Sequence, residues 1–97
     1  MASYILLATY TEQGLKTVKD TVKRASTVKE LAKKAGIDMK DTYWTLGQFD
    51  VVALFEAPDD ATMTAFSLSV AKLGNVKTQT LRAFSGQEMS DVLAKVT

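Results

Sequence analysis

The sequence contains no cysteine and no histidine, and it has a single proline and a single tryptophan among its 97 residues. Without cysteine, the chain has no disulfide, no thiolate nucleophile and no thiolate ligand for a metal. Without histidine, it lacks the side chain that most often acts as a general base or a metal ligand near neutral pH. We therefore expect the purified protein to carry no metal, no haem and no other cofactor.

The sequence also lacks a large excess of charge of one sign and any apolar helical segment long enough to cross a membrane. The 12 basic and 11 acidic side chains leave a formal net charge of +1, which gives no overall field to recruit nucleic acid or an anionic membrane. The longest uncharged helical candidate, Ala61–Ala71, is far short of the ~20 residues that span a bilayer. The N-terminus also lacks the basic start of a signal peptide. We expect one soluble domain over residues 1–97, located in the cytoplasm.

The stretch Tyr43–Pro58 predicts two strands joined by a turn at residues 47–50, where glycine and aspartate bracket the reversal. The second arm, Val51–Phe55, is apolar on both faces, and so is Tyr4–Ala8 near the N-terminus. Strands of this kind need cover on both sides of their sheet. Because a chain of this length supplies enough helix for one face only, we expect another copy of the chain to cover the second.

Strand and helix patterns follow one another in the order βαββαβ, with a short helix after them. Apolar residues recur at helical spacing from Leu15 to Ala35, with an interruption at Asp20-Thr21 that predicts a first short helix and a restart. Thr11, Asp59 and a capping box at residues 85–88 are predicted to begin helices. The predicted strands are residues 3–10, 39–46, 50–57 and 76–84, and the later helices are residues 61–73 and 85–96.

This order is that of an α+β protein with a ferredoxin-like fold, in which a four-stranded antiparallel sheet has the spatial order 4-1-3-2. Strands one and three are central in that order, and they are the two that are apolar on both faces. The more polar second and fourth strands become the edges. Agreement between residue pattern and strand position is the main support for this fold class.

Several groups of residues resemble the GYD-domain family of short bacterial and archaeal proteins: Tyr43–Asp50, Glu56–Asp59, and Leu73–Val76 together with Thr80–Phe84. The resemblance covers nearly the whole chain. It implies a ferredoxin-like fold of the dimeric α/β-barrel type, and it implies no established activity, since the family as a whole is uncharacterised. The chain departs from the family at Phe49, where tyrosine is usual, so any role of a hydroxyl at that position is lost here.

The candidates for ligand binding are polar and aromatic side chains of the predicted hairpin and last strand: Tyr43, Trp44, Asp50 and Arg82, with Tyr10 and Asn75 as outliers. Each also has a structural interpretation, with Trp44 in the core, Asp50 capping the turn, and Arg82 paired with Asp50 or Glu56. If Arg82 is paired with a buried acid, Arg82→Met should cost ~3 kcal/mol of stability. If Arg82 anchors a ligand, the same change should spare the melting temperature and abolish binding of a carboxylate-bearing small molecule.

Two further groups have simpler interpretations. Residues 16–40 hold eight basic side chains against three acidic ones, which is typical of a solvated helix face rather than of a nucleic-acid surface with interleaved aromatic residues. Asp59 and Asp60 follow the only proline and indicate a helix cap rather than half of a cation site.

Two functional hypotheses remain open. The first is a homo-oligomeric module that binds a small molecule in a cavity at the sheet face opposite the helices. The alternative is a small cofactor-independent enzyme of the barrel monooxygenase kind, for which the only candidate bases are a carboxylate or a tyrosine. A solvent-open cavity that contains Arg82 and an aromatic hydroxyl would favour the enzyme.

The doubly apolar central strands predict that the chain is not a monomer. Sedimentation at micromolar concentration should show a homodimer or larger homo-oligomer, with an apolar interface above ~2,000 Å² in total. A folded single-chain species would contradict this prediction. Replacing both Val52 and Leu54 with aspartate should abolish folding, because one of the two faces is expected to be internal core.

Overall fold

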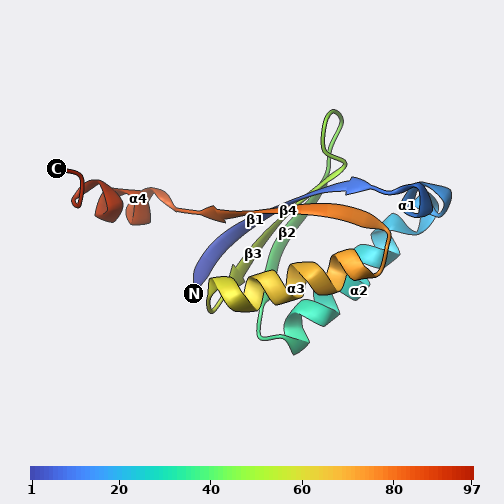
Figure 1. Cartoon of the computed structure of the whole chain (residues 1–97), viewed down its shortest axis with the longest axis horizontal. Coiled ribbons are helices and arrows are strands. Elements are labelled where there is room, and N and C mark those ends of the chain that lie inside the picture. The colour runs from blue at the N-terminus through green and yellow to red at the C-terminus, as the bar shows by residue number, and fades with distance from the viewer.

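The computed structural model describes all residues 1–97 and contains a four-stranded antiparallel sheet in the order β2-β3-β1-β4 (Figure 1). The predicted ferredoxin-like fold is confirmed, with β1 and β3 central and β2 and β4 at the edges. The elements are β1 (Ala2–Tyr10), α1 (Glu12–Lys16), the 3₁₀ turn η1 (Val18–Asp20), α2 (Thr21–Lys34), β2 (Asp38–Trp44), β3 (Val51–Ala57), α3 (Asp60–Lys72), β4 (Val76–Ala83) and α4 (Gly86–Leu93).

The two long helices, α2 and α3, lie on the same side of the sheet (Figure 1), which we call the helix side. Alternate residues of the central strands are buried there, as the period of two along a strand requires. The Phe55 and Phe66 rings pack edge to face, with centroids 5.4 Å apart, and so join β3 to α3. The buried core consists of Tyr4, Leu6, Ala8, Ala32, Ile37, Met39, Ala53, Phe55, Ala57, Met63, Phe66 and Val70.

The other residues of the same strands form the opposite side of the sheet, which we call the outer face. Neither α2 nor α3 covers it. Its apolar side chains lie beside one another in the strand register and are half-buried or exposed: Ile5, Leu7, Tyr43, Val52, Leu54 and Leu81. This is the face for which the sequence predicts a second copy of the chain.

The structure corrects one premise about β3. Val52 and Leu54 both project from the outer face, whereas Ala53 and Phe55 are the buried residues of that strand. The expectation that replacing Val52 and Leu54 with aspartate removes internal core was therefore wrong. These substitutions are now expected to separate subunits while the chain stays folded.

Local signals in the sequence explain where three of the four α-helices start. The Thr11 side chain accepts a hydrogen bond from the backbone N–H of Gly14 at 3.1 Å, and Asp59 accepts one from Thr62 at 2.8 Å. The predicted interruption near Asp20 is present as η1, although the Asp20 side chain makes no capping hydrogen bond. The capping box of α4 is also confirmed, while α4 ends at Leu93 rather than at residue 96.

Helix α1 is held against the loop that precedes β4. The backbone N–H of Thr11 donates to the Asn75 carbonyl at 3.1 Å, and the Gln13 amide donates to the Asn75 side chain at 3.0 Å. Gly14 is buried at this contact, and a Cβ added to it would lie 2.0 Å from the Asn75 carbonyl oxygen. Only glycine allows the two backbones to approach this closely.

We predict that Gly14→Ala lowers the free energy of unfolding by about 1–3 kcal/mol, because α1 must move off Asn75 to make room for the methyl group. Gly86→Ala is the matched control, since a Cβ there meets nothing within 4 Å. Thermal denaturation of both variants checks this prediction. Equal melting temperatures for the two variants would show that the close approach is unimportant.

Candidate functional site

The four candidate residues do not form one site. Trp44 ends the edge strand β2 and lies in the same row of the sheet as Ala8, whereas Arg82 belongs to the opposite edge strand and pairs with Tyr4. The two side chains are thus separated across the sheet and along it. Tyr43, next to Trp44, projects from the outer face and is 55% exposed.

Asp50 holds the base of the β2–β3 loop against β1. Its carboxylate accepts a hydrogen bond from the backbone N–H of Tyr10 at 2.9 Å, and its own N–H donates to the Ala8 carbonyl at 2.9 Å. The Thr45 N–H donates to the Asp50 carbonyl, also at 2.9 Å, and closes the loop, which projects from the sheet (Figure 1). These backbone contacts agree with the interpretation of Asp50 as a structural residue of the turn.

Trp44 lies at the rim of a cavity between α2 and the sheet and is 42% exposed. Its Nε1–H donates to Thr21 Oγ1 at 3.0 Å, and the Tyr10 hydroxyl lies 3.0 Å from the same oxygen. Asn75 lines the cavity as well. The structure thus brings Trp44 together with the two outlying candidates, Tyr10 and Asn75. It also adds Thr21 and Arg24 to this group. The sequence alone indicates Thr21 only as part of a helix start and Arg24 only as a solvated basic residue.

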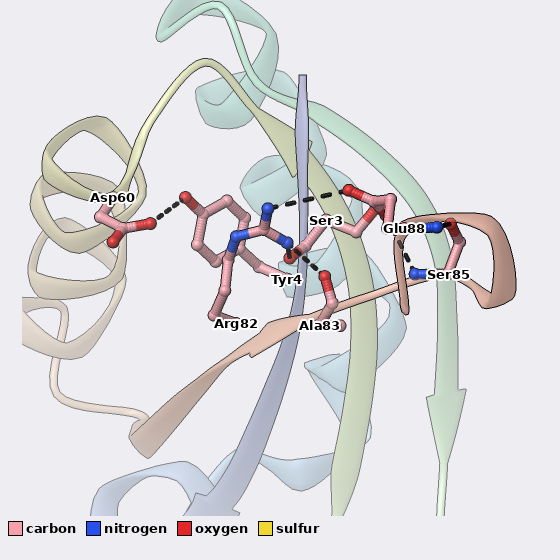
Figure 2. Close-up of polar contacts among 7 residues, drawn as sticks. All are labelled: Ser3, Tyr4, Asp60, Arg82, Ala83, Ser85 and Glu88. Atoms are coloured by element: carbon pink, nitrogen blue, oxygen red, sulfur yellow. Dashed lines mark hydrogen bonds and ion pairs between the residues drawn. The ribbon is translucent and has the colours of Figure 1, made fainter. Parts of the chain in front are cut away.

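The expected partners of Arg82 were wrong. Its guanidinium pairs with Glu88 at 3.8 Å, not with Asp50 or Glu56, and it also donates to the carbonyls of Ser3 and Ala83 (Figure 2). The guanidinium carbon lies 4.5 Å from the centre of the Phe84 ring and 5.6 Å from that of Tyr4.

Because both members of the Arg82–Glu88 pair are more than a third exposed, solvent screens their attraction. The loss of stability expected for Arg82→Met assumed that the acid paired with Arg82 is buried. Because Glu88 is not buried, a large loss of stability is no longer expected for this substitution.

Arg82, Tyr4, Asp60 and Glu88 form a cluster that connects four elements, β4, β1, α3 and α4, at the end of the sheet. The Tyr4 hydroxyl donates to Asp60 at 2.5 Å and ties β1 to the start of α3 (Figure 2). This hydrogen bond to the Asp60 carboxylate raises the pKa of Tyr4 above its usual value of 10.0. Glu88 accepts the backbone N–H of Ser85, which lowers the pKa of Glu88 below 4.5. Arg82 and the capping box together orient α4 relative to β4.

Helix α4 extends away from the sheet and from the other helices (Figure 1). None of its residues is buried. Four apolar side chains recur at the spacing of one helix face, continuing past Leu93 into the C-terminal residues, and all are exposed: Met89, Val92, Leu93 and Val96. We call them the α4 stripe. In the sequence, the capping box alone predicts this helix, and the spacing of these apolar residues is the signal that could have indicated the exposed face.

The model of the GYD domain family matches residues 4–93. The chain belongs to the GYD domain family. A protein of Thermus thermophilus named "Glutamine synthetase and cystathionine beta-lyase binding protein" is 34% identical over 97 residues, which covers 99% of each chain. Among solved structures, the one titled "crystal structure of FFRP-DM1" aligns with a TM-score of 0.62 over 87% of this chain and 100% of its own. At 16% identity, that likeness supports the fold alone.

Two absences are plain in this GYD domain. No helix is both long enough and apolar enough to cross a bilayer. No group of three or more acidic, histidine or cysteine side chains is placed to hold a metal ion. Elemental analysis of the purified protein remains the test of whether it carries a metal.

We predict that the helix caps of this GYD domain make it labile to acid. Hydrogen bonds from Thr62 lower the pKa of Asp59 below its usual 3.8, as those from Ser85 do for Glu88. A carboxyl group whose pKa is lower in the folded state contributes stability above its unfolded pKa and loses it as pH falls through the folded value. Helix content, followed by circular dichroism, should therefore fall as pH is lowered below about 4.

Asp59→Asn should weaken this acid dependence, because asparagine caps a helix without titrating. Asp91→Asn removes a carboxylate that caps no helix and is the matched control. Identical acid transitions for the two variants would contradict the assignment to the cap.

Proposed function

We propose that this GYD domain, spanning residues 1–97, is a homo-oligomeric module that binds another protein and uses the α4 stripe to do so. The observation that carries the proposal is the position of α4. A helix face with exposed apolar side chains, here Met89, Val92 and Leu93 with Val96 just beyond the helix, gains stability when it is buried against another surface. Helices that present such a stripe dock into apolar grooves of partner proteins through residues one turn apart.

The outer face supplies the contact between copies. Its centre is apolar, around Leu7, Val52 and Leu54, and its border is charged. At the border, Lys40 lies between Asp38 and Glu56, at 2.9 and 3.5 Å from their carboxylates. An apolar centre with a polar rim is the usual composition of a stable interface between subunits.

The class of partner follows from the relative. The Thermus thermophilus protein is named for binding glutamine synthetase and cystathionine beta-lyase, and its similarity to this chain extends over 99% of both. Because the likeness includes β4 and α4, the docking element is part of what the two proteins share. We propose a metabolic enzyme of this kind as the partner, met in the cytoplasm.

The alternative of a monooxygenase-like enzyme has no specific observation in its favour. A solvent-open cavity with Arg82 and an aromatic hydroxyl would have favoured it, but Arg82 lies at the end of the sheet with Glu88 and does not line the helix-side cavity. The expected place of a ligand cavity, the outer face, also differs from that of the cavity beside Trp44, which is on the helix side.

We predict that the oligomer binds purified glutamine synthetase or cystathionine beta-lyase from its own organism. Leu93→Lys should weaken this binding at least about tenfold, since it places a charge within an apolar contact. Ser90→Lys adds the same charge to a polar position of α4 and should bind as the parent does. Biolayer interferometry with each immobilised enzyme gives the affinities.

Sedimentation of the same variants separates this outcome from another use of α4. If Leu93→Lys dissociates the oligomer, the stripe packs against a second copy and not against an enzyme. Failure of the parent protein to bind either enzyme at micromolar concentration would overturn the proposed partner class.

A further inference from the structure

The proposed function does not use the helix-side cavity, the one with Trp44 at its rim. It has a volume of about 290 Å³, and 13 of its 18 lining residues are hydrophobic. Ala53 and Phe55 of β3 and Leu6 of β1 line it from the sheet, and Ala25 and Val28 line it from α2. Binding sites for small molecules are concave and mostly apolar, with few polar groups that fix the orientation of the ligand. The volume restricts an occupant to a small organic molecule.

Three side chains with polar groups, those of Tyr10, Thr21 and Trp44, meet at one end of the cavity, where β1 and β2 finish, while Thr27 and Thr42 line it elsewhere. Trp44, Thr21 and Tyr10 each carry one proton able to form a hydrogen bond. The two hydrogen bonds that join these residues use two of those protons. Whichever hydroxyl donates to the other, one O–H remains free. This end of the cavity therefore offers a donor to an oxygen atom of a ligand.

Arg24 adds a positive charge at the same end. It lies one helical turn after Thr21, on the same face of α2, and lines the cavity. Its Nη1 donates to the carbonyl and hydroxyl oxygens of Thr17 at 2.8 Å, and its Nη2 donates to the Gly14 carbonyl at 3.2 Å. All these acceptors are neutral, and none of the ion pairs of the chain involves Arg24. The guanidinium is therefore fixed in place with its charge uncompensated.

We propose that the helix-side cavity binds a small carboxylate with an apolar body, such as an aryl-substituted or aliphatic short-chain acid. The hydrocarbon part fills the space between α2 and the sheet. The carboxylate lies at the polar end, where Arg24 balances its charge and the free O–H of the Tyr10–Thr21 pair donates to one of its oxygens. Charge-assisted hydrogen bonds of this kind are stronger than neutral ones. This site is independent of the outer face and of the α4 stripe.

The test uses the full chain and the fluorescence of Trp44, the single tryptophan, which lies at the rim of the site. The probes are 4-phenylbutyrate and hexanoate, each titrated beside its neutral alcohol, 4-phenylbutan-1-ol or hexan-1-ol. We expect saturable changes in emission, with each acid binding at least about tenfold more tightly than its alcohol. Absence of a saturable change with either acid up to millimolar concentration overturns the proposal.

Two pairs of variants locate the site. Arg24→Gln should abolish the preference for acid over alcohol, while Lys23→Gln, which removes the same charge from an exposed position on the same turn, should keep it. Ala25→Phe fills the cavity and should abolish binding of both probes, while Ser26→Phe adds the same ring to an exposed position and should not. Equal behaviour of Arg24→Gln and Lys23→Gln, or continued binding by Ala25→Phe, would overturn the assignment to this cavity.

Discussion

A sheet whose two central strands are apolar on both faces is the constraint on which this structure depends. Its own helices can satisfy one face, because the chain length allows only two helices of sufficient size to pack beside each other. The buried core, from Tyr4 to Val70, lies entirely on that side. The outer face is left with aliphatic side chains at its centre, and the cost of leaving them in water would be the driving force for the proposed association between copies.

The same constraint made the fold predictable from the sequence. Val51–Phe55 and Tyr4–Ala8 are continuous apolar runs, and only the central positions of a sheet suit such runs. The starts of three helices were equally predictable, because the side chains of Thr11, Asp59 and Ser85 accept hydrogen bonds from backbone N–H groups only three residues further along the chain. Where an element is specified by its own residue pattern and its own capping residue, its predicted and observed boundaries differ by a few residues at most.

The candidate site was less predictable, for a physical reason that Arg82 illustrates. Its possible partners were sought on β3, but β1 separates β3 from β4 in the sheet. The acid within reach belongs to α4, six residues further along the chain. Arg24 illustrates the same difficulty, since helical periodicity gave it a place among the solvated bases of α2. Its contact with the cavity depends on how α2 is turned against the sheet, which is a property of tertiary packing and leaves no local signal.

The three surfaces of this GYD domain are separable because the sheet keeps them apart. The α4 stripe follows the end of β4 that pairs with Ser3 and Tyr4, whereas the polar end of the cavity lies where β4 begins, beside Tyr10. The outer face is divided from both the cavity and the core by the thickness of the sheet. A substitution at one surface therefore leaves the side chains of the other two in place. The proposed oligomerisation, protein binding and ligand binding can thus each be tested by substitutions that leave the other two surfaces unchanged.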